Sequence, residues 1–213
     1  MKRILIYSVS FTLLLFLFRV IYTGSILFFF IPWNLFLAWL PLLFSSKIKS
    51  DANKFKNGIL YCLWLLFFPN APYLITDLFH LHIRTGIPLY FDLILLFTAA
   101  WNGILLGFLS IQNIEYSLLN YISNKTIKAI TILSFFLCGF GIYLGRFERY
   151  NSWHLLTQPV DLLKDIAIRF IKPWDHPRTW AVTFLFALPL FLIYETLKKI
   201  PAHFTEQGSL NKL

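Results

Sequence analysis

Six stretches of the chain are apolar, nearly free of charge and about as long as a bilayer is thick. A membrane-spanning helix needs roughly 20 such residues, because the hydrocarbon core is about 30 Å thick and a helix rises about 1.5 Å per residue. The stretches are residues 4–22, 26–44, 58–75, 91–111, 129–145 and 180–197. They predict an all-α, polytopic membrane helix bundle with about six transmembrane helices.

Composition and charge also favour a membrane location. Hydrophobic residues make up 58% of the 213 residues and charged residues 14%, whereas soluble domains have roughly 45–50% and about 25%. The formal net charge of +9 suits an anionic membrane surface. No aromatic-basic module for nucleic acid accompanies this charge. We therefore expect the lipid bilayer, and anionic lipids in particular, as the partner, and no nucleic acid.

The apolar stretches define one expected domain. We expect residues 1–200 to form a single transmembrane helical domain and residues 201–213 to form a polar C-terminal tail. The first stretch lacks a small-residue cleavage site, so we interpret it as an uncleaved span and not as a signal peptide. Cys62 and Cys138 lie inside apolar runs without metal-ligand or redox spacing, which indicates a packing role.

The distribution of lysine and arginine predicts the orientation. The basic N-terminus and the basic loop at residues 45–57 fall on the same side of the membrane. Basic residues in short loops favour the cytoplasmic side, and the early spans usually dominate. Both termini should therefore be cytoplasmic, and the connection at residues 146–179 should be external.

The first polar motif, PNAPYLITDLFHLH, covers residues 69–82 at the end of the third stretch. Pro69 and Pro72 each remove a helix donor and clash with the preceding turn. The third span should therefore kink or break near its outer end. Broken helices at membrane depth are tolerated where they are buried in protein or line a cavity.

This motif supplies the candidate catalytic residues Asp77 and His80, followed by Arg84 as a candidate substrate-binding residue. If residues 77–84 are helical, Asp77, His80 and Arg84 share a face, and His82 points away. If the segment is extended, His80 and His82 share a face instead. The simpler alternative is that Asp77 caps a short helix and the histidines lie at the membrane interface.

The second polar motif, GRFERYNSWH, covers residues 145–154. It supplies four candidate substrate-binding residues, Arg146, Glu148, Arg149 and Asn151. Arginine binds phosphate or carboxylate groups through two parallel hydrogen bonds. The simpler alternative is anchoring, because arginines near helix ends reach toward lipid phosphates without a specific ligand.

An amphipathic helix follows the second motif, in the sequence TQPVDLLKDIAIRFIK at residues 157–172. Pro159 suits the first turn of a helix. Apolar residues repeat with helical spacing, and much of the other face is charged, with Asp161, Lys164, Asp165, Arg169 and Lys172. We expect this helix to lie in the membrane interface between spans five and six. Capping the bundle is the alternative.

The predicted topology brings both motifs to the outer side of the membrane. Polar groups in spans usually face the bundle interior, so we expect one outward-opening polar pocket. Its expected lining residues are Asp77, His80, Arg84, Asp92, Arg146, Glu148, Arg149 and Asn151. Pairing between the acidic first motif and the basic second motif would leave one arginine for an anionic ligand.

The two motifs together resemble those of an uncharacterised bacterial membrane family, domain of unknown function 1361. The resemblance is carried by Pro69-Asn70-Ala71-Pro72-Tyr73 with Thr76-Asp77 and His80, and by Gly145-Arg146-Phe147 with Arg149, Asn151, Ser152 and Trp153. It covers nearly the whole chain. In the family an acidic residue often follows the tryptophan, and here that position is His154. The resemblance implies a bacterial inner-membrane location and brings no activity with it.

Three classes of function fit these features. The first is a non-catalytic role in membrane assembly or lipid organisation. The second is a membrane-embedded enzyme for a lipid-linked or anionic substrate, in which arginines hold the substrate, His80 is the acid or base and Asp77 orients it. The third is a small-solute transporter whose broken third span lines the path. No metal site, nucleotide loop or nucleophile motif stands out, so we expect no cofactor.

Overall fold

The computed structural model describes residues 2–49, 53–150 and 154–210. This part of the chain is helical apart from short connections and one isolated bridge between Arg84 and Ile87, which confirms the predicted all-α class. The chain divides into two compact units, residues 1–127 and 128–213, and each is described by itself. The single domain expected over residues 1–200 stays a prediction.

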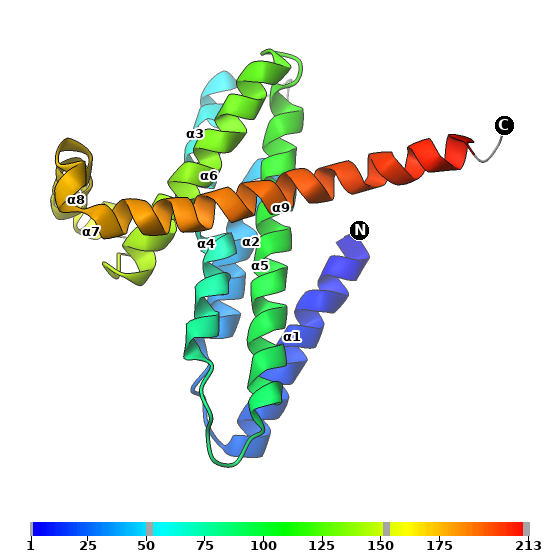
Figure 1. The fold of residues 1–213 in the computed structure, drawn as a ribbon, viewed down its shortest axis with the longest axis vertical. Coiled ribbons are helices and arrows are strands. Elements are labelled where there is room, and N and C mark those ends of the chain that lie inside the picture. Colours follow the sequence, from blue (N-terminus) through cyan, green and yellow to red (C-terminus); the bar gives the residue numbers. More distant parts are fainter. Residues whose placement is uncertain (1, 50–52, 151–153, 211–213) are drawn as a thin grey trace. The chain divides into compact units, whose positions relative to one another are not determined.

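Unit 1 is a group of helices around one long central helix (Figure 1). Its elements are α1 (Lys2–Thr23), α2 (Phe30–Ser46), α3 (Lys54–Phe67), α4 (Asn70–Tyr73), the 3-10 helix η1 (Leu74–His80), α5 (Leu89–Leu118) and the start of α6 (Asn124–Arg146). The central helix α5 contacts α1, α2, α4 and η1.

Unit 2 contains the rest of α6 and the elements that follow it. These are α7 (His154–Thr157), α8 (Pro159–Ile171), the 3-10 helix η2 (Pro173–Asp175) and α9 (Pro177–Leu210). Pro159 lies in the first turn of α8, as predicted. Because α9 reaches Leu210, helical backbone continues through most of the segment that we expected as a polar tail.

Five helical segments in the described part of the chain are long and apolar enough to cross a membrane. They are Arg3–Thr23, Lys54–His80, Leu89–Leu118, Asn124–Arg146 and Pro177–Ile200. The second predicted span, residues 26–44, corresponds to α2, an apolar helix of 17 residues. That length is at the lower limit of about 17 residues for a span. The helices are thus those of a multi-pass membrane bundle.

The two prolines of the first motif interrupt the third span as predicted. α3 ends at Phe67, and the chain continues through one α-helical turn into η1. The Ala71 N–H donates to the Phe68 carbonyl over 3.2 Å, so a tighter turn replaces a regular α-helical bond there. Helical structure ends at His80, and Leu81 is extended. Residues 77–84 are therefore neither fully helical nor fully extended.

Small residues on α5 let the broken third span approach closely. A Cβ added at Gly103 would fall against the Ala71 carbonyl oxygen and 3.1 Å from Leu74 Cβ. A Cβ at Gly107, one turn further along α5, would lie 3.3 Å from Ala71 Cβ. Close approach of this kind is a common way for helices to pack in membranes, where lipid supplies no hydrophobic drive for association.

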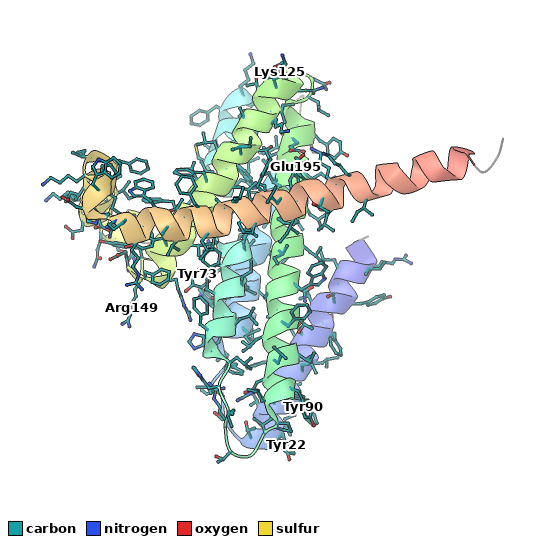
Figure 2. All side chains as sticks on the ribbon, in the orientation of Figure 1. Tyr22, Tyr73, Tyr90, Lys125, Arg149 and Glu195 are labelled. Atoms are coloured by element: carbon teal, nitrogen blue, oxygen red, sulfur yellow. The ribbon has the colours of Figure 1, made fainter. Side chains whose placement is uncertain are left out.

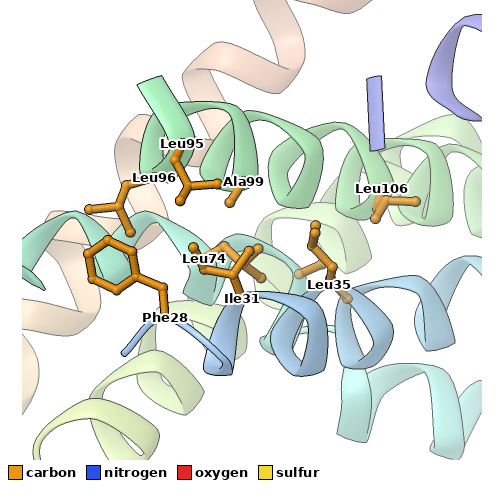
Figure 3. Packing of buried hydrophobic residues seen from close by; sticks show 10 residues of the cluster. Phe28, Ile31, Leu35, Leu74, Leu95, Leu96, Ala99 and Leu106 are labelled. Atoms are coloured by element: carbon orange, nitrogen blue, oxygen red, sulfur yellow. The ribbon is translucent and has the colours of Figure 1, made fainter. Parts of the chain in front are cut away.

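The apolar core of unit 1 lies between α2, α4, η1 and α5 (Figure 3). Its buried members are Phe28, Ile31, Leu35, Ala38, Ala71, Leu74, Leu95, Leu96, Ala99 and Leu106. Polar contacts add to it. Asn102, which is fully buried on α5, donates to Thr12 Oγ1 on α1 over 2.9 Å. Trp64 on α3 donates to Ser110 Oγ on α5 over 3.1 Å. These bonds hold α1 and α3 against the central helix.

Unit 2 has its own close crossing, between α6 and α9. A Cβ added at Gly139 would fall against the Thr183 carbonyl oxygen and 3.1 Å from the Ala187 amide nitrogen. A separate apolar cluster joins α6 to α8 through Phe140, Tyr143, Leu144 and Leu162. Through this cluster, α8 packs against the end of α6, where the second motif begins.

Candidate functional site

A buried ion pair joins α1 to α5 at one end of unit 1. The Arg19 Nε donates to Asp92 Oδ1 over 2.7 Å, and its Nη2 donates to Oδ2 over 3.2 Å. The two side chains are only 2% and 1% exposed. Tyr22 and Tyr90, close to this pair in sequence, lie at the same end of unit 1, opposite Lys125 (Figure 2). The pair is bidentate, which is the strongest geometry for arginine and carboxylate.

A second guanidinium group, that of Arg84, reaches the same carboxylate. Its Nη1 donates to Asp92 Oδ2 over 3.3 Å and to the His82 carbonyl over 3.2 Å. Its Nη2 donates to the His80 carbonyl over 2.9 Å. These bonds tie the loop after η1 to the start of α5. Unlike Arg19, the Arg84 side chain keeps 24% of its surface exposed.

Both guanidinium groups also lie against the buried Phe28 ring. The Cζ atoms of Arg19 and Arg84 are 4.2 Å and 5.2 Å from its centroid. An aromatic face attracts cations at such distances. We call Arg19, Arg84, Asp92 and Phe28 the arginine cluster. Its ion pairs join two positive charges to one negative charge, so it carries one positive charge in excess.

The two candidate catalytic residues lie on one face of η1. A 3-10 helix has three residues per turn, so side chains at i and i+3 are eclipsed, as Asp77 and His80 are. Asp77 is 1% exposed, and its Oδ2 accepts a hydrogen bond from Asn34 Nδ2 over 2.9 Å. The His80 ring packs against Phe30 with centroids 4.9 Å apart. His82 is exposed in the extended segment beyond η1.

Unit 2 has a polar cluster of opposite charge balance. Arg169 on α8 forms ion pairs with Glu148 over 3.0 Å and with Asp165 over 2.9 Å. The Tyr143 hydroxyl donates to Glu148 Oε1 over 2.6 Å. Arg169 Nη1 lies 3.3 Å from His176 Nδ1. One buried guanidinium group thus joins two carboxylates and links α8 to the end of α6.

The remaining candidates of the second motif are spread around the end of α6. Arg146 is the last residue of α6. Arg149 is exposed and has a φ of 61°, in the left-handed region that non-glycine residues rarely adopt. Burial, and after it the nearby carboxylates of Asp165, Asp161 and Glu148, raise the pKa of the neighbouring Tyr150. Asn151 lies outside the described residues.

The structure brings together only part of the predicted pocket. Arg84 and Asp92 are in direct contact within unit 1, and Arg19 joins them. Asp77, His80, Arg84 and Asp92 belong to unit 1, whereas Arg146, Glu148 and Arg149 belong to unit 2. The shared pocket between the two motifs therefore stays a prediction. Within the described residues, no three His, Cys, Asp or Glu side chains are grouped so as to hold a metal ion.

Sequence reasoning missed two features. One is the pairing of Arg19 with Asp92, for which a signal existed: Arg19 is the only charge in the first apolar stretch, and such a charge needs a partner inside the bundle. The other is the central place of Arg169, which we had assigned to the charged face of the amphipathic helix. Its spacing of four residues from Asp165 was the available signal.

Comparison with known proteins gives one match. Residues 33–193 match a family described as "Protein of unknown function (DUF1361)". The chain belongs to this family. The matched region includes both polar motifs, Arg84 and Asp92, whereas Arg19 precedes it. Neither the search of curated proteins nor the search of solved structures gave a match. Membership in DUF1361 confirms the resemblance noted from the sequence and adds no activity.

Proposed function

We propose that this DUF1361 protein binds anionic lipid at one surface of the bacterial inner membrane and organises it without altering it chemically. The observation that carries the proposal is the surface of α8. This helix buries Leu162 and Arg169 against the rest of unit 2 and leaves most of its other large apolar side chains exposed.

Four of the exposed apolar side chains of α8 form one continuous arc, and a fifth, Ile168, lies about 60° beyond it. At about 100° per residue, Phe170, Leu163, Val160 and Ile171 follow one another around the helix. They are 49%, 57%, 60% and 75% exposed. Lys164 is exposed next to the edge of this arc, and Lys172 is exposed further around, beside the exposed Asp161. An apolar arc with lysines beside it is typical of helices that lie in a membrane interface.

Energetics favour lipid as the partner of this arc. Fully burying a large aliphatic or aromatic side chain is worth about 1.5–3 kcal/mol, so leaving four of them in water would cost several kcal/mol. Each lysine near an anionic surface adds about 1 kcal/mol. Trp174, which follows α8 and is 92% exposed, is a residue type enriched at membrane interfaces. Together these terms support binding to anionic lipid rather than to a neutral surface.

The test places an environment-sensitive fluorophore on the arc. The protein, with Cys62 and Cys138 replaced by Ala, carries one labelled cysteine in place of Leu163, in nanodiscs of zwitterionic lipid with increasing phosphatidylglycerol. We expect a blue-shifted emission that shifts further as phosphatidylglycerol increases. Lys164→Gln with Lys172→Gln should remove this dependence on anionic lipid. The matched control, Lys47→Gln with Lys49→Gln, removes the same amount of charge elsewhere in the chain and should retain the dependence on anionic lipid. A water-like emission in all lipids would contradict the proposal.

The second candidate function is that of a membrane-embedded enzyme, which is supported by the position of Asp77 and His80 on one face of η1. The same nanodiscs distinguish the two functions, because the lipid can be recovered and its mass measured. Our proposal expects lipid of unchanged mass after incubation. Conversion that His80→Gln abolishes would favour the enzyme.

A further inference from the structure

We propose that the arginine cluster of unit 1 is a binding site for a singly charged oxyanion, a phosphate group, with Arg84 as the residue that contacts it. The site belongs to the loop between the third and fourth spans. It involves no residue of α8 and goes beyond the interfacial binding proposed above.

The first argument is charge. The cluster holds two guanidinium groups and one carboxylate that are joined by ion pairs. Arginine stays protonated in proteins, so the excess positive charge cannot be removed by deprotonation. A charge next to a low-dielectric membrane is costly unless it is paired. One bound monoanion would make the cluster neutral.

The second argument is the number of hydrogen-bond donors. Each guanidinium group has five N–H donors. The three hydrogen bonds of Arg84 use its Nη1 and Nη2 atoms. Its Nε–H makes no hydrogen bond with the described residues. Arg19 Nη1 is buried and has no hydrogen-bond partner in the described part of the chain. The cluster therefore has N–H donors left over besides the three that bond to its own carboxylate.

The third argument is pre-organisation. Arg19 is buried in its bidentate ion pair with Asp92, so it contributes positive charge and holds the carboxylate in place without contacting a ligand. The carboxylate and two backbone carbonyls then fix the Arg84 guanidinium, which remains partly exposed. The loop is closed by the bridge between Arg84 and Ile87, with Gly86 at a φ of 90°. A ligand would thus meet a donor group that is already held in position, which limits the entropy lost on binding.

The ligand chemistry follows from these features. Guanidinium groups bind phosphate oxygens through charge-assisted hydrogen bonds. A single excess charge matches a phosphodiester, such as an anionic lipid headgroup, or the dihydrogen form of free phosphate. Both sources present the same chemistry, and the experiment separates them.

Native mass spectrometry of the full-length protein, released from detergent with added phosphatidylglycerol, tests the site. We expect one lipid retained by the wild type at concentrations where the rest has dissociated. Arg84→Gln should weaken this binding at least about tenfold, because it removes the charge-assisted hydrogen bonds of the guanidinium group. Arg84→Lys should bind with intermediate strength, because lysine keeps the positive charge but cannot form two parallel hydrogen bonds to one phosphate group. The matched control is Arg178→Gln, which removes an arginine that lies over Phe147 in unit 2.

Addition of inorganic phosphate identifies the source of the ligand. If phosphate displaces the lipid, the site takes the free anion, and if it does not, the site takes the lipid headgroup. Either result supports the site, provided that Arg84→Gln weakens binding and that Arg84→Lys recovers part of it. Equal retention in wild type and Arg84→Gln, or equal loss in Arg84→Gln and Arg178→Gln, would overturn the proposal. Because no variant changes α8, failure here leaves the fluorescence test of α8 unaffected.

Discussion

Replacing Asp92 with Asn should destabilise unit 1 more than any other single change in the arginine cluster. Asp92 accepts all three hydrogen bonds that connect the two arginines to a carboxylate. Its loss would leave Arg19, which is 2% exposed, with no counterion. Removing one partner of a buried ion pair typically costs about 3–5 kcal/mol. Arg19→Met should cost less, about 1–3 kcal/mol, because Asp92 would still be paired with Arg84.

The order of these two costs is the informative result. Reversible unfolding in mixed micelles, followed by circular dichroism, gives the free energy of unfolding for each variant. Asp161→Asn is the control, because Asp161 is exposed on α8, and exposed substitutions usually change stability by less than about 0.5 kcal/mol. If Asp92→Asn costs under about 1 kcal/mol, or less than Arg19→Met, the arginine cluster does not stabilise unit 1 in the way that its geometry implies.

Three further predictions concern packing, topology and the link between the motifs. Gly103→Leu should destabilise the protein by at least about 1–3 kcal/mol, as overpacking does, in the same unfolding assay. In intact cells, a thiol reagent that cannot cross the membrane should label a cysteine at Ser152 and leave one at Ser50 unlabelled. A double-mutant cycle on Asp77 and Arg146 should show a coupling energy above about 0.5 kcal/mol if the two motifs share one pocket.

Each of these predictions has a defined control. Gly58→Leu introduces the same side chain on α3, where a Cβ meets nothing within 4 Å, and it should cost far less than the change at Gly103. The labelling experiment needs Cys62 and Cys138 replaced by Ala, and the reverse labelling pattern would invert the topology. Simple additivity in the cycle would leave two independent structural motifs.

The fold was largely predictable, because the length of each apolar stretch identifies a membrane-spanning helix. The ends of the helices were harder to predict from the sequence, and α5 shows why. The fourth span was predicted to end at residue 111, yet α5 continues to Leu118. The apolar stretch ends where polar residues begin, but Ser117 bonds to Tyr61 over 2.8 Å and Glu115 is buried. Polar residues that pair with a neighbouring helix do not end a span, and the sequence alone does not reveal the pairing.

The sequence predicted some residues of the candidate site but not which of them pair with one another. Asp92 and Arg84 were in the expected pocket, but Arg19 lies 73 residues from Asp92 in sequence, and no spacing rule connects positions that far apart. Arg169 was misjudged for a different reason. A helical pattern places charged residues on the solvent side, whereas Glu148 and Tyr143 provide a polar environment for this arginine inside unit 2. Tertiary pairing overrode the local pattern in both cases.

The proposal that this protein binds lipid without transforming it is tested most directly by a lipid and metabolite profile of a strain that lacks the gene. The profile is compared with the parent strain and with the deletion strain carrying the gene on a plasmid. We expect no new lipid or lipid-linked intermediate to accumulate and no change in solute content. Accumulation of one specific lipid, reversed by the wild type and not by His80→Gln, would contradict the account and assign an enzyme. A changed solute content would instead assign a transporter.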